Sequence, residues 1–215
     1  MKTILAFGDS LTFGANPSGG ARHAYEDRWP SALEAGLAGK ARVIAEGLGG
    51  RTTVSDDWYA AADRNGGRIL PTLLESHSPL DLVIIMLGTN DLKPAICGSA
   101  LEASFGMRRL VHIIRGHYAG KDETAPDILL MAPPLICQSE NADMMGHFGG
   151  VAHGLEQSAQ FAAHYARRAE ELETLFFDAS TVAKADPEDG VHLDASNTRA
   201  IGAALVPVVR QALGL

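Results

Sequence analysis

Two segments near opposite ends of the sequence carry residues that could attack a carbonyl carbon. Gly8-Asp9-Ser10 offers a hydroxyl, and Asp189-Gly190-Val191-His192 offers an imidazole with a carboxylate three residues before it. A serine hydroxyl is a weak nucleophile that needs a base within hydrogen-bond reach. His192 suits that role because an imidazole titrates near neutral pH, and the Asp189 carboxylate can fix its tautomer. We therefore predict Ser10 as a nucleophile, His192 as its base and Asp189 as the partner of the base.

Two further segments could hold the charge that develops on the attacked oxygen. Such charge needs hydrogen-bond donors that are already in position. The glycine-rich segment 46–52 can offer a backbone N–H, and Gly88-Thr89-Asn90-Asp91 can offer a side-chain amide. We expect the donors to be the N–H groups of Ser10 and Gly50 and the amide of Asn90. Together these four segments predict a hydrolase that works by acyl transfer.

Each segment also has a simpler interpretation. Ser10 could cap a helix, and Asn90-Asp91 could form a turn. The glycines could bind a phosphate, although Thr52 stands where the GxGxxG pattern needs its last glycine. The chain contains no GxSxG, which excludes the nucleophile elbow of α/β-hydrolases. Asp178 could replace Asp189 as the partner of His192, but we interpret it as a structural turn residue.

The elements that must position these segments alternate between strands and helices. We predict strands at Thr3–Phe7, Arg42–Ala45, Asp81–Leu87, Asp127–Met131 and Thr174–Phe177, and helices at Trp29–Leu37, Arg68–His77, Leu101–Tyr118, Leu155–Leu172 and Ala195–Leu213. The third strand is apolar without alternation, which is typical of a strand covered on both faces. This order predicts an α/β fold with a parallel sheet. Ligands bind at the carboxyl ends of such strands, which is where the polar segments follow.

Two segments are too long for simple connections. Gly14–Asp27 and Ala132–Gly150 are rich in Gly, Pro and Asp, and we expect functional or lid-like loops there. Met144, Met145, His147 and Phe148 in the second loop could line an acyl pocket or a subunit contact. No repeat or linker divides the chain, so we expect one domain over residues 1–215.

The composition of the chain argues against several kinds of binding partner and cofactor. The 215 residues carry a formal charge of -8, which disfavours nucleic acid and anionic membrane surfaces. Two cysteines, Cys97 and Cys137, form no metal-ligand spacing, and we expect buried free thiols. The eight histidines match no metal motif, so we predict neither a metal nor a cofactor. The first apolar run is too short for a signal peptide, and we expect a soluble, cytoplasmic protein.

The four segments, taken together, resemble the GDSL/SGNH hydrolases. The residues that carry the resemblance are Phe7-Gly8-Asp9-Ser10-Leu11-Thr12-Phe13-Gly14, Gly50, Gly88-Thr89-Asn90-Asp91 and Asp189-Gly190-Val191-His192. The resemblance implies a flavodoxin-like three-layer α/β/α fold with a five-stranded parallel sheet. It implies Ser10, Asp189 and His192 as catalytic residues, and Ser10, Gly50 and Asn90 as the oxyanion hole. Asp9 would hold the serine loop.

A narrower similarity links the chain to the bacterial arylesterase/acyltransferase subgroup. It rests on Gly47-Leu48-Gly49-Gly50-Arg51-Thr52-Thr53, on the run from Asp81 to Lys93, and on Ala132-Pro133-Pro134-Leu135. It implies a serine esterase for short acyl esters, including aryl esters, and a homo-oligomer. Apart from the resemblance, we interpret Trp58 and Tyr59 first as ordinary packing residues and second as an interface patch. Phe13 and Ala15 stand where this subgroup has tryptophans, which favours water over other acyl acceptors. Alternatives are a carbohydrate acetylesterase, a lysophospholipase or thioesterase, and a non-catalytic flavodoxin-like binding module.

Overall fold

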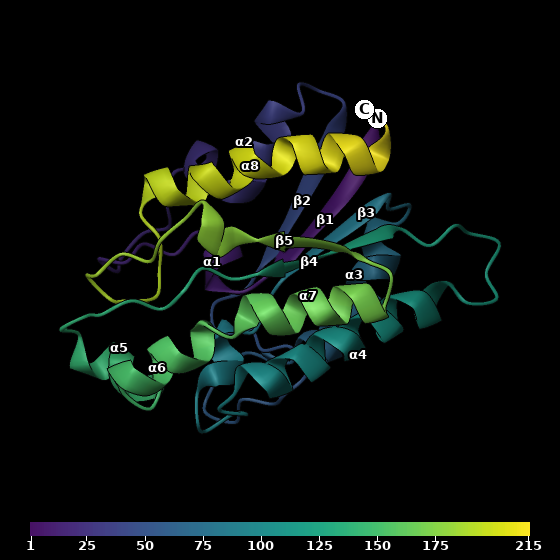
Figure 1. The fold of residues 1–215 in the computed structure, drawn as a ribbon. Helices are drawn as coiled ribbons and strands as arrows, with labels where there is room; N and C mark the ends of the chain where they lie inside the picture. Colours follow the sequence, from purple (N-terminus) through teal and green to yellow (C-terminus); the bar gives the residue numbers. More distant parts are fainter.

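Five parallel strands form the sheet at the centre of the molecule (Figure 1). The computed structural model describes residues 1–215. The strands are β1 (Lys2–Gly8), β2 (Ala41–Gly47), β3 (Leu82–Met86), β4 (Asp127–Ala132) and β5 (Leu175–Asp178), and they lie in the order β2-β1-β3-β4-β5. All neighbouring strands pair in parallel, so their carboxyl ends share one edge of the sheet.

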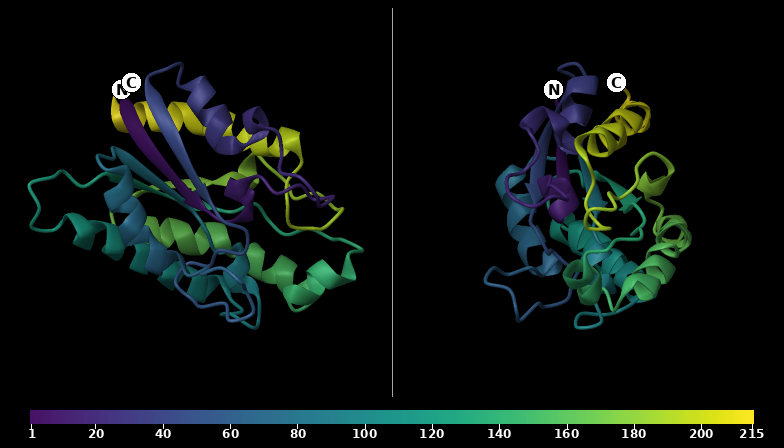
Figure 2. Two further views of the ribbon diagram at one scale, coloured as in Figure 1. Left: turned by 180° about the vertical axis from the view of Figure 1, so that it is seen from behind. Right: turned by 90° about the vertical axis from the view of Figure 1, so that its left-hand side faces the viewer.

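Helices cover both faces of this sheet and complete three layers, which Figure 2 shows from two further sides. Helices α2 (Trp29–Gly36) and α8 (Ala195–Leu213) pack on one face, and α3 (Gly66–His77), α4 (Ala100–Tyr118) and α7 (Phe161–Glu171) pack on the other. Strand β1 contributes to the hydrophobic core on each face. Ile4 and Ala6 pack in the core beneath α2 and α8, whereas Leu5 and Phe7 pack in the core beneath α3, α4 and α7. Side chains of a strand alternate between faces, so a fully apolar strand supplies two cores at once. The predicted α/β/α fold is confirmed.

Shorter elements lie mainly beyond the carboxyl ends of the strands. They are α1 (Ser10–Phe13), η1 (Tyr25–Asp27), η2 (Thr89–Leu92), α5 (Ala142–His147), α6 (Val151–Ser158) and η3 (Ala179–Thr181). Four of them, α1, η2, α5 and α6, carry or adjoin the predicted site segments. No helix of the structure combines the length and apolar character needed to cross a bilayer.

The helix predicted over Leu155–Leu172 is wrong as one element. The chain forms α6 and α7 instead, with a break at Ala159 and Gln160. Ser158 explains the break: its buried hydroxyl donates to Leu155 O at 3.3 Å and accepts from Ile136 N at 3.1 Å. A hydroxyl that bonds its own helix and a distant segment competes with the helical ladder.

The long segment 132–150 is not wholly a loop. Asn141 accepts a hydrogen bond from Met144 N at 3.0 Å and caps α5, whose Met145 is buried in the core. Both cysteines are free, as expected, but each is partly exposed rather than buried. Cys97 lies 3.0 Å from the Ser55 hydroxyl.

Candidate active site

Ser10 stands at the first turn after strand β1, which lies between β2 and β3. Asp9 follows the strand and caps α1, accepting a hydrogen bond from Leu11 N at 2.9 Å. Ser10 is the first residue of that helix, so its N–H has no partner within the helix. The alternative in which Ser10 is the cap is therefore wrong, because Asp9 makes the cap.

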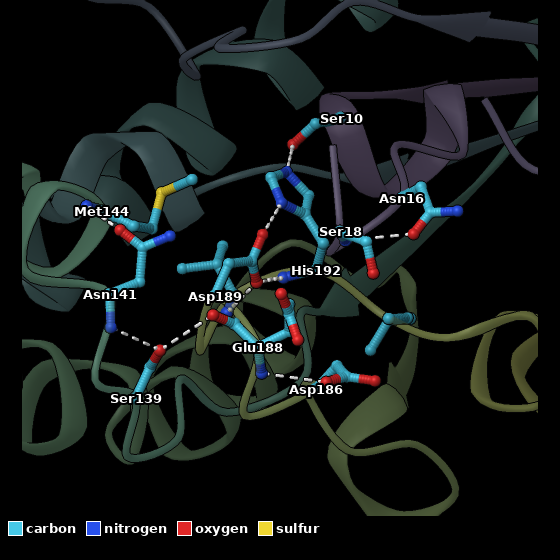
Figure 3. A network of polar contacts seen from close by, with 12 residues as sticks. Ser10, Asn16, Ser18, Ser139, Asn141, Met144, Asp186, Glu188, Asp189 and His192 are labelled. Carbon is cyan, nitrogen blue, oxygen red and sulfur yellow. Dashed lines mark hydrogen bonds and ion pairs between the residues drawn. The ribbon is translucent and has the colours of Figure 1, made fainter. Parts of the chain in front are cut away.

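His192 links the hydroxyl of Ser10 to the carboxylate of Asp189 (Figure 3). His192 Nε2 lies 2.9 Å from Ser10 Oγ, and His192 Nδ1 lies 2.5 Å from Asp189 Oδ2. Ser10 and His192 are 182 positions apart in sequence, and the parallel sheet brings them to one edge. The contacts form the unbroken chain from hydroxyl through imidazole to carboxylate that nucleophilic catalysis by serine requires.

Asp189 is held as an anion. Its other oxygen accepts from Val191 N at 2.9 Å and from His192 N at 2.8 Å. Burial acts to raise the pKa of this carboxyl, but the bond from His192 and the two backbone bonds outweigh burial and lower it. Asp189 therefore stays ionised and accepts from Nδ1, which leaves Nε2 free to accept the proton of Ser10.

The alternative partner of His192 has another task. Asp178 accepts a hydrogen bond from Ser180 N at 2.9 Å and caps η3 after strand β5. It is the structural turn residue that the sequence predicts. In the structure, no group of three or more His, Cys, Asp or Glu side chains is arranged to hold a metal ion.

Asn90 and Gly50 come from the strands on either side of β1. Asn90 Nδ2 donates to Arg51 O at 3.1 Å and meets Asp9 Oδ2 at 3.4 Å, so the amide faces the serine turn from β3. The N–H of Gly50 has no acceptor in the protein. Gly50 has a φ of +79°, and a Cβ there would lie 2.3 Å from Arg64 Nη1. The positive φ favours glycine here, because side chains with a Cβ rarely adopt it.

A buried carboxylate joins the segment of Gly50 to the segment of Asn90. Asp91 accepts from Thr53 N at 3.0 Å and from Thr53 Oγ1 at 2.5 Å. Burial raises the pKa of Asp91 to about 7, with bonds from Thr53 opposing and the nearby charge of Asp9 adding to the shift. Burial likewise raises the pKa of Asp9 to about 6. In the sequence, the only signal of this role of Asp91 is its position beside Asn90.

Tyr165 of α7 fixes the backbone that leads from β3 to Asn90. Its buried hydroxyl donates to Leu87 O at 2.8 Å, directly before Gly88. Gly88 has a φ of +122°, and a Cβ there would lie 2.0 Å from the tyrosine hydroxyl oxygen. This contact holds the turn that leads to Asn90, and nothing in the spacing of the sequence predicts it.

The segment from Pro133 to Gly150, which we call the flap, supports the loop of His192. Cys137 N donates to Gly190 O at 2.9 Å, and Ser139 Oγ donates to Glu188 O at 3.2 Å. Figure 3 shows Ser139, Asn141 and Met144 beside this loop. Of the side chains expected at an acyl pocket, Met145 and Phe148 are buried in the core, Met144 is half-buried and His147 is exposed.

The chain matches one family of known proteins over most of its length. Residues 6–198 match the model of the GDSL-like Lipase/Acylhydrolase family. No curated protein matches the chain.

Several solved structures share the fold over the whole chain. A carbohydrate acetylesterase family member from Sinorhizobium meliloti is 52% identical, with a TM-score of 0.95 and 100% of each chain covered. Est24, a carbohydrate acetylesterase from the same species, is 38% identical, with a TM-score of 0.92 and coverage of 98% and 99%. The aryl esterase of M. smegmatis is 37% identical, with a TM-score of 0.91 and coverage of 99% and 100%. The chain belongs to the GDSL-like lipase/acylhydrolase family, and it is a carboxylic ester hydrolase of that family.

Proposed function

We propose that the protein hydrolyses small esters of short acyl groups, acetate above all, through an acyl-enzyme on Ser10. The observation that carries this proposal is the pair of contacts at His192, 2.9 Å to Ser10 Oγ and 2.5 Å to Asp189 Oδ2. A nucleophile, a base and an orienting carboxylate are in hydrogen-bond reach of one another without any rearrangement.

In the first step, His192 Nε2 takes the proton of Ser10 as the hydroxyl oxygen attacks the carbonyl carbon. The carbonyl oxygen becomes an oxyanion, which the N–H groups of Ser10 and Gly50 and one N–H of Asn90 Nδ2 stabilise. The Nδ2 hydrogen directed at Asp9, across 3.4 Å between nitrogen and oxygen, is the weakly held one, and we assign it as the donor to the oxyanion. His192 then gives its proton to the leaving alcohol.

In the second step, water replaces the alcohol. His192 takes a proton from the water as it attacks the acyl-serine, and the acid leaves when Ser10 regains its proton. Asp189 remains ionised throughout and stabilises the imidazolium that forms in both steps.

The relatives suggest two kinds of alcohol. Two of the similar structures are described as carbohydrate acetylesterases and one as an aryl esterase. We propose aryl and alkyl acetates as substrates of this chain, with acetylated carbohydrate as the second candidate. Release of acetate from peracetylated sugars, compared with p-nitrophenyl acetate, separates the two.

Transfer of the acyl group to an alcohol is a side activity in this proposal. The Arg22 guanidinium lies 3.8 Å from the centre of the Phe13 ring, so a charged group covers an aromatic side chain three residues after the nucleophile. A polar cover favours water as the acceptor. Hydrolysis should therefore exceed ester formation when both water and a primary alcohol are offered.

Replacing Ser10 tests the mechanism. Ser10→Ala should abolish the hydrolysis of p-nitrophenyl acetate, and a fluorophosphonate should label the wild type but not the variant. The control is Ser196→Ala, which removes an exposed hydroxyl bonded only to Asp194. Full activity in Ser10→Ala would exclude the mechanism and favour a binding module.

The homo-oligomer is also a proposal. Trp58 and Tyr59 are 87% and 91% exposed on the connection between Thr53 and α3, which is unusual for large aromatic side chains. A second copy would bury them. Size-exclusion chromatography of the wild type and of Trp58→Ser tests the oligomeric state. We also propose a cytoplasmic location, which cell fractionation tests.

A further inference from the structure

Two cationic side chains flank the predicted oxyanion hole. Arg64 packs directly on Gly50, since a Cβ built there would lie 2.3 Å from its Nη1 and 2.6 Å from its Cζ. Lys93 follows the segment of Asn90 and starts from a backbone turn in which Lys93 N donates to Asn90 O at 3.3 Å. The Arg64 guanidinium therefore adjoins the proposed donor from β2. Lys93 adjoins Asn90 through its backbone, and its ammonium is near enough to Arg64, Asp9 and Asp91 to interact with their charges.

Arg64 is paired with a single carboxylate, and Lys93 is paired with none. Arg64 has one carboxylate partner, Asp57, at 3.2 Å, and its buried Nε has no hydrogen-bond acceptor. Lys93 makes no ion pair and no side-chain hydrogen bond, and its nearest described contact is the Phe148 ring, 5.7 Å from Nζ to the ring centre. Lys93 is nevertheless only partly exposed.

Burial and the nearby charge of Arg64 both disfavour the charged form of Lys93. Burial lowers the pKa of Lys93, and the charge of Arg64 lowers it further, while the charges of Asp57, Asp9 and Asp91 oppose the shift. The chain as a whole carries a net charge of -8, so acidic residues are available elsewhere to pair with cations. An ammonium that is partly desolvated beside a guanidinium, without a carboxylate in contact, is suited to an anion that arrives with the substrate.

The position of the two cations indicates which half of the ester, the acyl group or the alcohol, they would contact. The leaving alcohol must lie near His192 Nε2, which protonates it, and His192 belongs to the loop after β5. Arg64 and Lys93 belong to the segments after β2 and β3, beside the proposed oxyanion donors. A tetrahedral carbon on Ser10 with its oxygen in this hole and its alcohol toward His192 directs the acyl chain away from the histidine.

We propose that Arg64 and Lys93 bind a carboxylate on the acyl group, so that the site prefers mono-esters of short dicarboxylic acids to neutral esters of the same size. This inference rests on the proposed esterase function and names a substrate class for it. The acid half of the substrate would carry a negative charge two or three carbons from the scissile carbonyl. The reaction itself is unchanged: water and the ester give a dicarboxylic acid and an alcohol.

The test compares substrates that differ only in charge. Monoethyl succinate carries the acyl carboxylate, and ethyl succinamate replaces it with a neutral amide of the same shape. For the wild type at low salt, kcat/KM should be about tenfold higher for the anionic ester, and the ratio should fall in 0.5 M NaCl because salt screens partly exposed charges. Equal values for the two esters would overturn the proposal.

Variants of Lys93 assign the effect. Lys93→Met keeps the length of the side chain and should reduce the ratio about tenfold, whereas Lys93→Arg should retain it. The matched control is Lys40→Met, which removes the same charge from an exposed position at the other end of the sheet. If Lys93→Met lowers kcat equally for both esters, Lys93 stabilises the oxyanion and does not select the substrate, which overturns the proposal.

A second pair of esters tests the position of the carboxylate. In 3-acetoxybenzoate the charge lies on the alcohol, and 3-acetoxybenzamide is its neutral match. We expect a ratio near one for this pair, and a preference for 3-acetoxybenzoate alone would overturn the assignment to the acyl side. Hydrolysis of p-nitrophenyl acetate that is lost in Ser10→Ala keeps the esterase proposal intact whatever these ratios are, so the two failures are distinguishable.

Discussion

Replacing Asp91 with asparagine should change how the stability of the protein depends on pH. Asp91 is completely buried, and its pKa is about 7 in the folded state against 3.8 for an ordinary aspartate. Between these two values the folded state holds a proton that the unfolded chain has released. The free energy of unfolding therefore falls as the pH rises through this interval.

The magnitude follows from the shift. About three pKa units, at 1.36 kcal/mol for each unit, correspond to about 4 kcal/mol, of which about 3 kcal/mol falls between pH 5 and pH 8. The amide that Asp91→Asn introduces cannot ionise, so the variant lacks this contribution. Asp9 has a raised pKa too, but it is present in both proteins, so its effect largely cancels in the difference.

Urea unfolding at pH 5, 6, 7 and 8 measures this difference. Trp29 is completely buried and reports unfolding by its fluorescence. Relative to the wild type, Asp91→Asn should become more stable by about 3 kcal/mol between pH 5 and pH 8. Asp122→Asn, at an exposed carboxylate with no hydrogen bond, is the control and should show no such trend. A difference between wild type and Asp91→Asn that is the same at every pH would refute the raised pKa.

Three further substitutions test the site. Asp189→Asn should lower kcat for p-nitrophenyl acetate by about a thousandfold or more at unchanged Tm, because the amide no longer fixes the tautomer of His192; a loss under tenfold would contradict the role of Asp189. Gly50→Ala should lower kcat about tenfold or more, with a smaller change in KM, because a φ of +79° is strained for alanine and the strain displaces the N–H of residue 50; unchanged kinetics would contradict the requirement for glycine at this donor. Tyr165→Phe should lower the free energy of unfolding by about 1 to 2 kcal/mol in urea, because the buried Leu87 O loses its donor; wild-type stability would show that another group replaces the hydroxyl.

Most of the fold could be predicted from the sequence, because the local patterns of apolar residues agree with how the strands and helices pack. The run Leu82–Leu87 is apolar at every position, and the strand β3 that it forms is buried on both faces. The predicted bounds of the helix Ala195–Leu213 agree with the structure, where Asp194 caps its start and Gly214 its end. The break at Ala159 was not predictable from local spacing, because it depends on a hydrogen bond between Ser158 and Ile136, 22 residues apart.

The site residues could be predicted where they follow the carboxyl end of a predicted strand. Ser10, Asn90 and His192 each come shortly after a strand or in the loop behind it, so strand prediction brought them to one edge. The contact of Arg64 with Gly50 and the partial burial of Lys93 could not be predicted in this way. Arg64 reaches Gly50 through an irregular segment, and the environment of Lys93 includes Phe148, far along the chain in a flap whose path the sequence does not specify.

The two halves of the proposed machinery are attached to different parts of the molecule. The oxyanion donors are tied together in the core through Asp9, Asp91 and Thr53, whereas the loop of His192 is tied to the flap through Cys137 and Ser139. Evolution can therefore remodel the flap, and with it the shape of the acyl and alcohol subsites, while the charge-stabilising half keeps its geometry. A library that varies the exposed flap positions 138, 140, 142, 143, 146 and 147 and leaves 50–53 and 88–91 untouched should yield folded esterases with altered substrate ranges. A library that varies 50–53 and 88–91 instead should yield mostly inactive proteins.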